Sequence, residues 1–471
     1  MTNNHTSFFI YTPDTHDIFR TKGRESMKKA LSFVVILFLI LCTMGCQNQK
    51  QKQPDDIENS SLTQQQVEQP GENGEIQPLK SGNDKGYYLV EQSNDQNFNL
   101  VYIDYQTKQK VFLCSKPNCE HNNSACTSYL AGGNSFQNSS SVSNDYAVYC
   151  TDRELYLFYM GGSAFFSNGN PPAIYRMDLD GENRDVIFTA ESGTQFDRYI
   201  TPYTDGNNLY FQTQSIGASE PNEDGVVELG KSVDSLTCLN LTSGKSTNIL
   251  EMQNRSLLAG YQDGFILSET DELPQDVTEP EEIDKALANQ KTRIVLFRPD
   301  TQTSTLLYTA EPGAELWNSV RYGKQLFFIH KNNIMSLNLE NKTAEPVVMG
   351  LTATPALKQC YDGQLYFETR DNENKAAAYR YDLENKEYAP IQLMTNEPGA
   401  EPVSILAEAG NDYLVNYRCD RIRDEKDSVM IDENGTEHHF PSYTTTKRYY
   451  ALIAKSDYQN SHVEYKEISE R

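Results

Sequence analysis

Three cysteines and one histidine lie close together in the stretch "FLCSKPNCEHNNSACTSYL", residues 112–130. They are Cys114, Cys119, His121 and Cys126, and all lie within 13 residues. Thiolate sulfur and imidazole nitrogen are the ligands of structural zinc sites, where they form a closed tetrahedral set. The stretch therefore predicts a structural zinc site. Two features count against it, because the spacing is not a common zinc pattern and a Cys-x-His pair faces opposite sides of an extended chain.

The sequence leaves two other states of these thiols open. Disulfides are stable outside the cytoplasm, and Cys114 with Cys126 or Cys119 with Cys150 are candidate pairs. The chain has nine cysteines; without the two in the predicted signal region seven remain, an odd number that cannot all pair internally. Unpaired thiols are the third state. Three further single cysteines lie in or beside apolar strands and are expected to be buried core thiols: Cys238, Cys360 and Cys419.

The common catalytic motifs are absent from the sequence. The chain has no His-Glu-x-x-His motif, no Gly-x-Ser-x-Gly motif and no phosphate-binding glycine loop. Haem attachment and thiol redox catalysis use Cys-x-x-Cys, which is also absent. His438 and His439 lie in a charged insertion and are interpreted as exposed loop residues. The sequence therefore names no catalytic residue.

The N-terminal region has the pattern of a secretion signal. Met27–Cys46, "MKKALSFVVILFLILCTMGC", combines two lysines, an apolar run at 31–42 and a small residue before a cysteine. That run is shorter than the roughly 20 residues of a membrane span. The ending Thr-Met-Gly-Cys resembles a bacterial lipobox. Residues 1–46 are therefore predicted to be a signal region with its true start at Met27 and a lipid on Cys46, with an unlipidated secreted protein or an uncleaved anchor as alternatives.

A polar segment follows the predicted lipidation site. Residues 47–80 are rich in Gln, Asn, Glu, Pro and Gly and almost free of large apolar side chains. Such a segment buries too little surface to offset the entropy of ordering it. We expect a disordered tether at 47–80 that holds a folded domain, residues 81–471, away from the bilayer.

The folded domain contains a repeated pattern of strands. Short aromatic strands open at Gly or Asp turns: Gly86, Asp145, Asp205, Asp263, Gly323, Asp362 and Gly410. Each precedes a predicted β-hairpin, and the hairpins begin at Leu100, Ile174, Leu236, Ile294, Ile334, Ala378 and Tyr449. The spacing suits four-stranded propeller blades. We therefore predict an all-β protein with a seven-bladed β-propeller, with six or eight blades as the competing counts and a pair of β-sandwiches as the competing fold.

The repeat also carries a family resemblance. "DGQLYF" at Asp362 followed by "AYRYDL" resembles the propeller domain of unknown function that is common in Firmicute lipoproteins. It is also similar to TolB-type and low-density-lipoprotein-receptor-type propellers. "LCSKPNCEHNNSAC" from Leu113 resembles a cysteine block that follows the first blade in such lipoproteins. The resemblance implies a fold and a location but no activity, because propellers serve as enzymes, receptors and scaffolds.

The net charge of the chain makes some classes of binding partner improbable. A formal net charge of −25 repels nucleic acid and anionic lipid. Two functions remain. The favoured one is an extracytoplasmic, lipid-anchored binding module for a protein, a peptide or a glycan. The alternative is an extracytoplasmic polysaccharide hydrolase or lyase with its active site at the propeller axis. A cluster of inward-facing groups with raised pKa would favour the enzyme.

Overall fold

The computed structural model describes residues 74–92, 97–131, 146–161, 171–191, 193–197, 201–218, 229–272, 280–312, 314–371, 374–431 and 437–470. The predicted signal, Met27 and Cys46 lie outside these residues, as does most of the predicted tether. No helix in the described part is long and apolar enough to span a membrane.

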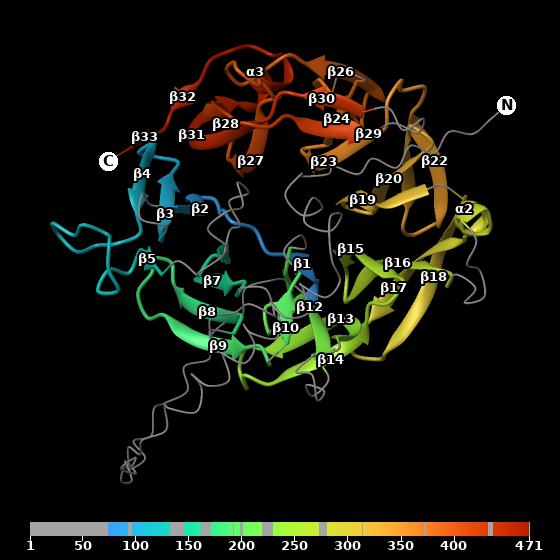
Figure 1. The fold of residues 1–471 in the computed structure, drawn as a ribbon, viewed down its shortest axis with the longest axis horizontal. Helices are drawn as coiled ribbons and strands as arrows, with labels where there is room; N and C mark the ends of the chain where they lie inside the picture. The colour runs from blue at the N-terminus through green and yellow to red at the C-terminus, as the bar shows by residue number, and fades with distance from the viewer. Residues whose placement is uncertain are drawn as a thin grey trace, which may run out of the picture.

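Seven β-sheets stand around a central axis, which confirms the predicted seven-bladed β-propeller (Figure 1). Within a blade, strands that follow one another in the chain pair antiparallel, as β15, β16, β17 and β18 do. Blade one carries the additional strand β5, and blade three carries the additional strands β1 and β10. Blade one contains β2 (Gly86–Gln92), β3 (Phe98–Asp104), β4 (Gln109–Phe112), β5 (Tyr129–Leu130) and β33 (Ser469–Glu470). Blade two contains β6 (Tyr146–Cys150), β7 (Glu154–Tyr159), β8 (Ala173–Asp178) and β9 (Asp185–Thr189). Blade three contains β1 (Gln77–Pro78), β10 (Thr194–Phe196), β11 (Tyr203–Thr204), β12 (Asn208–Ala218), β13 (Leu229–Asn240) and β14 (Ser246–Glu251).

The remaining four blades follow the same plan. Blade four contains β15 (Arg255–Tyr261), β16 (Gly264–Thr270), β17 (Thr292–Arg298) and β18 (Thr303–Ala310), with α2 (Pro280–Asn289) between β16 and β17. Blade five contains β19 (Ala314–Tyr322), β20 (Gln325–His330), β21 (Asn333–Asn338) and β22 (Thr343–Val348). Blade six contains β23 (Pro355–Tyr361), β24 (Gln364–Arg370), β25 (Ala376–Asp382) and β26 (Glu387–Ile391). Blade seven contains β27 (Ser404–Ala409), β28 (Asp412–Arg423), β31 (Tyr443–Ala454) and β32 (Lys466–Glu467). The helix α3 (Lys455–Gln459) directly follows β31. A separate hairpin of β29 (Ser428–Ile431) and β30 (Glu437–Phe440) lies between β28 and β31 in the chain.

Apolar clusters fill the interfaces between neighbouring blades. The second strand of a blade is buried on both faces, as in β16, where Phe265, Ile266 and Leu267 have no exposed surface. Phe265 packs toward blade three and Ile266 toward blade five, so each strand contributes to two interfaces. Fully burying such a side chain contributes about 1.5–3 kcal/mol. The ring is therefore held together mainly by packing between blades.

Two of the seven predicted hairpins differ from the expectation. The segment after Tyr449 does not turn back directly, because β31 ends at Ala454 and the chain enters α3. Tyr458 of α3 is buried, and its hydroxyl donates a hydrogen bond to the Val403 carbonyl over 2.7 Å. The hairpin predicted after Leu100 forms, but it makes up the second and third strands of blade one. In blades two to six the predicted hairpin makes up the third and fourth strands.

The ring closes in blade one through the C-terminal strand. β33 pairs in parallel with β4, on the edge where a fourth strand is needed. The Ser469 amide donates to the Lys108 carbonyl over 2.9 Å, and Glu470 lies 3.1 Å from Lys110 and 2.9 Å from Lys447. Residues at the two ends of the folded chain thus share one sheet, which restrains opening of the ring.

Removing the closing strands should weaken this ring. We expect a chain that lacks residues 466–471 to melt at a lower temperature, because it loses two strand pairings and the apolar contact of Ile468. Hydrogen exchange should rise most in β4. A Glu470→Gln variant is the matched control, since it removes the ion pairs of Glu470 with Lys110 and Lys447 but leaves both strand pairings. Such pairs near the surface contribute about 0–1 kcal/mol. Equal exchange in β4 of both variants would contradict a closing role.

The described chain begins with a segment that was predicted to be tether. Residues 75–81, here called the inner strap, run along the inner edges of blades four, three, two and one. The Ile76 amide bonds to blade four, β1 pairs with β11, and the Lys80 carbonyl accepts a hydrogen bond from the Cys150 amide over 2.7 Å. Ile76 and Leu79 are only 2% and 4% exposed. Two apolar residues among polar neighbours are therefore enough to dock this segment.

Candidate metal centre

The cysteine-rich stretch forms a loop that leaves blade one after β4 and returns to it as β5. Backbone hydrogen bonds hold both ends of this loop on β3. The Leu113 amide donates to the Leu100 carbonyl over 2.9 Å, and the Leu100 amide donates to the Ser128 carbonyl over 2.8 Å. The Ser128 hydroxyl also donates to the Leu100 carbonyl. The loop is thus fixed to the blade independently of any metal ion.

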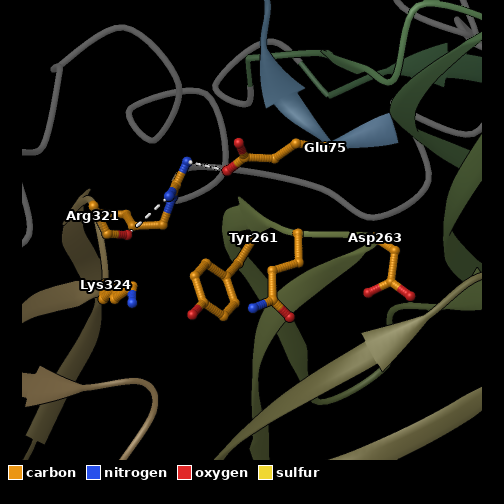
Figure 2. A pocket seen from close by; sticks show the side chains of 7 residues that line it. Glu75, Tyr261, Asp263, Arg321 and Lys324 are labelled. Atoms are coloured by element: carbon orange, nitrogen blue, oxygen red, sulfur yellow. Dashed lines mark hydrogen bonds and ion pairs between the residues drawn. The ribbon is translucent and has the colours of Figure 1, made fainter. Parts of the chain in front are cut away.

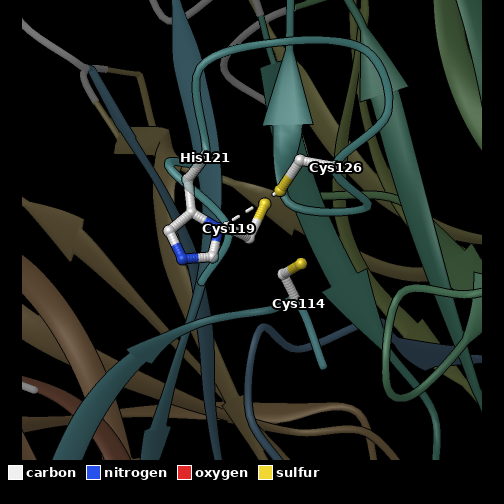
Figure 3. Close-up of side chains that lie close together, drawn as sticks. All are labelled: Cys114, Cys119, His121 and Cys126. Atoms are coloured by element: carbon white, nitrogen blue, oxygen red, sulfur yellow. Dashed lines mark hydrogen bonds between the residues drawn. The ribbon is translucent and has the colours of Figure 1, made fainter. Parts of the chain in front are cut away.

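The four predicted ligands come together in this loop (Figure 3). One ligand atom from each of Cys114, Cys119, His121 and Cys126 lies within 4.8 Å of all the others. His121 Nδ1 and Cys126 Sγ are 3.2 Å apart. The structure therefore contains a Cys3His cluster of the size that one metal ion requires.

The objection from the Cys-x-His spacing does not apply, because the chain is not extended there. His121 has a φ of 56° and Asn118 also has a φ of 56°, both in the left-handed region. Such residues turn the chain sharply, so the side chains of Cys119 and His121 face the same centre. Asparagine and histidine both adopt this conformation more readily than most other non-glycine residues.

Neighbouring groups fix the orientation of His121. The Phe112 ring stacks on its imidazole with 4.4 Å between ring centroids and an interplanar angle of 30°. The Asn99 side-chain amide donates to the His121 carbonyl over 2.9 Å and to the Ser128 hydroxyl over 3.2 Å. Asn99 is itself buried. The stacked Phe112 ring thus holds the imidazole, whereas Asn99 holds the backbone of His121.

Three groups of the cluster have pKa values that are shifted from their ordinary values. Burial opposes ionisation of Cys114, but hydrogen bonds from the Lys116 amide and the Cys126 thiol lower the pKa of Cys114 below its ordinary value. Burial and the proton donated to Cys114 raise the pKa of Cys126 to about 11. Burial lowers the pKa of His121, which favours the neutral imidazole that binds metal ions.

The described cysteines are all free thiols. Cys150, a candidate partner of Cys119, is buried in β6 and is not part of the Cys3His cluster. Cys419 is buried as predicted, whereas Cys238 and Cys360 are only half-buried. The exposure predicted for His439 is confirmed, but its placement in a loop is wrong, because His438 and His439 lie in strand β30. The side chain of His438 lies outside the described residues.

A polar pocket of about 580 Å³ lies where the inner strap meets blades four and five (Figure 2). Arg321 Nη2 is 3.4 Å from Glu75 Oε1, and Arg298 Nε is 3.1 Å from Asp263 Oδ1. The Arg321 guanidinium also lies 5.8 Å from the centroid of the Tyr261 ring. Sequence reasoning missed this pocket because Glu75 was assigned to the tether.

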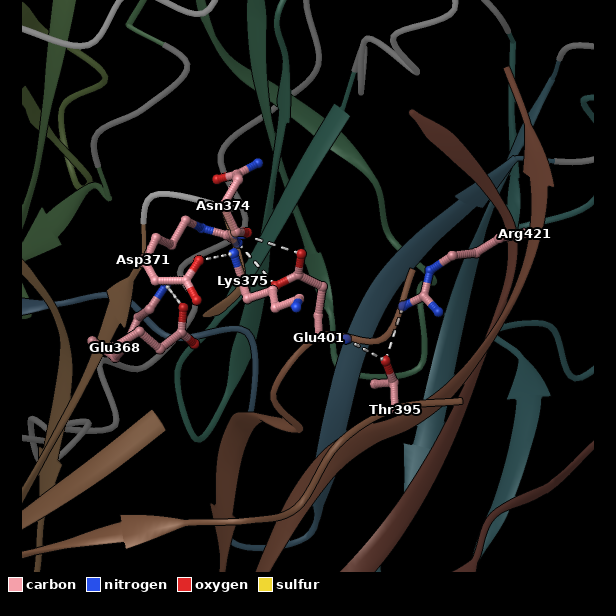
Figure 4. A network of polar contacts seen from close by, with 9 residues as sticks. Glu368, Asp371, Asn374, Lys375, Thr395, Glu401 and Arg421 are labelled. Atoms are coloured by element: carbon pink, nitrogen blue, oxygen red, sulfur yellow. Dashed lines mark hydrogen bonds and ion pairs between the residues drawn. The ribbon is translucent and has the colours of Figure 1, made fainter. Parts of the chain in front are cut away.

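A second polar network joins blades six and seven (Figure 4). Arg370 Nη2 is 2.9 Å from Glu401 Oε2, and the Glu401 amide donates to the Thr395 hydroxyl over 3.0 Å. Arg421 donates to the same hydroxyl over 3.0 Å. The Asp371 carboxylate accepts a hydrogen bond from the Lys375 amide. These contacts hold the loop before β27 in place, so the network has a structural explanation.

Comparisons with known proteins find distant similarity to solved structures. No protein-family model matches the chain, and no curated protein matches it. An oligogalacturonate lyase in complex with manganese is 15% identical over 72% of this chain and 84% of that one, with a TM-score of 0.42. TolB from Acinetobacter baumannii is 12% identical over 75% and 79%, with a TM-score of 0.31. A puromycin-hydrolysing peptidase from Mycobacterium tuberculosis is 10% identical over 84% and 62%, with a TM-score of 0.44. The blade topology itself therefore establishes the propeller.

Proposed function

We propose that this chain is an extracytoplasmic protein anchored to the cell membrane by a lipid on Cys46, and that its propeller binds a protein, a peptide or a glycan. The observation that carries the binding function is the pocket at the inner strap, in which Arg321 is already paired with Glu75. Such groups can orient a ligand through hydrogen bonds. They are less suited to transferring protons during a reaction.

Three carboxyl groups act as structural hydrogen-bond acceptors. Asp382, Asp424 and Glu470 have pKa values lowered by hydrogen bonds from a backbone amide, a hydroxyl and an ammonium group, respectively. These carboxylates stay charged at neutral pH.

Within this function, the Cys3His cluster serves as a structural zinc site. Three sulfur ligands and one imidazole suit zinc in a closed tetrahedral set. The four ligands lie in the loop between β4 and β5, so the ion would pin this loop against blade one. Zinc would supply binding energy to the folded state, with no chemical step.

The anchor is tested by changing the predicted lipidation site. We expect the native chain in the membrane fraction, with an N-terminal peptide that begins at lipid-modified Cys46. A Cys46→Ala chain should lose this modification. Cys42→Ala is the matched control, because Cys42 lies in the apolar run of the signal and should leave processing unchanged. A membrane-bound chain with unmodified Cys46 would contradict the lipid anchor.

The binding function is tested against the catalytic one by product analysis. Neutral and acidic oligosaccharides incubated with the purified chain should be recovered intact, as judged by mass spectrometry. Shorter products that increase in proportion to the protein concentration would contradict the binding function and show that the protein is a hydrolase or lyase. A lyase would be identified by an unsaturated product that is lighter by one water than the product of hydrolysis at the same bond.

A further inference from the structure

The pocket at the inner strap receives charges of opposite sign from different parts of the ring (Figure 2). Arg321 and Lys324 come from blade five, where they lie on β19 and on the turn after it. Glu75 comes from the inner strap, and Asp263 from the turn after β15 of blade four. The volume of about 580 Å³ is within the usual range of small-molecule sites. One blade thus supplies the cations of this pocket, and the neighbouring blade and the strap supply its carboxylates.

Two of these four groups already have full-length ion pairs within their own blades. Arg298 Nε lies 3.1 Å from both carboxylate oxygens of Asp263. Lys324 Nζ lies 2.6 Å from Glu340 Oε1. Each of these pairs cancels its own charge, so a ligand gains little by contacting Asp263 or Lys324.

The pair of Arg321 and Glu75 is looser. Arg321 Nη2 is 3.4 Å from Glu75 Oε1, whereas charged hydrogen bonds are usually about 2.7–2.9 Å long. Arg321 Nη1 also donates to the Gly323 carbonyl over 2.9 Å. Among the described residues these bonds use only part of the five N–H donors of a guanidinium. The side chains of Arg321 and Glu75 are 19% and 38% exposed, so both groups are open to a ligand.

We propose that this pocket binds a free amino acid or a short peptide through its ammonium and carboxylate groups. The ligand carboxylate accepts hydrogen bonds from Arg321, whose planar guanidinium suits two parallel bonds to a carboxylate. The ligand ammonium donates to Glu75. The inference rests on the proposed binding function and selects peptide from its three ligand classes.

The charges of the pocket argue against ligands of a single sign. A ligand that is only an anion meets the like charge of Glu75, and one that is only a cation meets the like charge of Arg321. A zwitterion pairs with both groups. It also has no net charge, so the net charge of −25 on the chain does not repel it.

The proposal is tested by ligand-observed NMR with the full chain in a non-ionic detergent, at about pH 6.5, where both ends of a peptide are charged. The probes are alanine, dialanine and trialanine. Each is compared with its N-acetyl form, which is only an anion, and its amide, which is only a cation. We expect saturable binding of at least one free probe. Both of its blocked forms should bind about tenfold more weakly or worse, because each loses a charged hydrogen bond.

Variants of the two pocket residues test the role of each charge. Glu75→Gln should weaken binding of the free probe about tenfold but should not weaken binding of its N-acetyl form. Arg321→Lys should weaken binding of both, because an ammonium cannot bind a carboxylate through two parallel bonds. Hydrogen exchange of the 74–82 peptide should stay native in Glu75→Gln, since Ile76 and Leu79 still hold the strap.

Glu401→Gln is the matched control. Glu401 also pairs with an arginine, Arg370, over 2.9 Å, but it does not line this pocket, so its variant should bind the probes normally. Absence of saturable binding by all free probes, equal binding of free and blocked forms, or tighter binding of the free probe by Glu75→Gln would each overturn the zwitterion site. The membrane anchor and the protein and glycan classes would then stand. Release of alanine from bound trialanine would keep the site and overturn the non-enzymatic function.

Discussion

The purified chain should contain about one zinc ion per molecule, because the three thiols and one imidazole of its Cys3His cluster already lie within 4.8 Å of one another. Cys119→Ser should abolish stoichiometric zinc and lower the melting temperature. The loss should be smaller than the about 10–16 kcal/mol that zinc contributes in zinc-finger peptides, because the ends of this loop are also bonded to β3. Metal content by mass spectrometry and calorimetric melting measure both effects.

The control for this experiment is Cys238→Ser. Cys238 is half-buried on β13 and lies outside the cluster, so its variant should retain zinc. Thiol counting under denaturing conditions separates the remaining states. A metal-free chain that has lost pairs of thiols would replace the zinc site with a disulfide-linked loop. A metal-free chain with all thiols free would show that the cluster is neither a zinc site nor a disulfide-linked loop.

Gly260→Ala should detach the inner strap and destabilise the protein by about 1–3 kcal/mol, the usual effect of overpacking. A Cβ atom at this position would overlap the Ile76 backbone carbonyl, and backbone cannot give way as a flexible side chain can. Displacing Ile76 also exposes Leu79, which is buried in the same strap. Hydrogen exchange of the 74–82 peptide should therefore rise strongly, together with a lower melting temperature.

Gly244→Ala provides the comparison. Gly244 has a φ of 68° but nothing within 4 Å of its added Cβ, so its variant suffers backbone strain without touching the strap. Exchange in the 74–82 peptide should stay at the native level in this variant. If Gly260→Ala leaves that exchange unchanged as well, the close contact between Gly260 and the strap is not required for docking.

Local patterns were sufficient to predict the architecture. Alternating apolar residues and Asp-Gly turns act over a few residues, and the repeat of the same pattern specifies the same hairpin in each blade. The turns before Leu209, Phe265 and Leu365 thus open the second strands of blades three, four and six. The segment after Tyr449 was predicted wrongly because burial of Tyr458 favours a helical turn over a tight hairpin.

The sequence by itself determined the residue types of the Cys3His cluster, the strand repeats and the charge that disfavours anionic ligands. Only the tertiary structure decided that His121 adopts a left-handed conformation, that residues 75–81 dock inside the ring and that β33 closes blade one. These features depend on contacts between residues far apart in the chain, and local pattern carries no information about which distant partner a strand edge or a buried amide will meet.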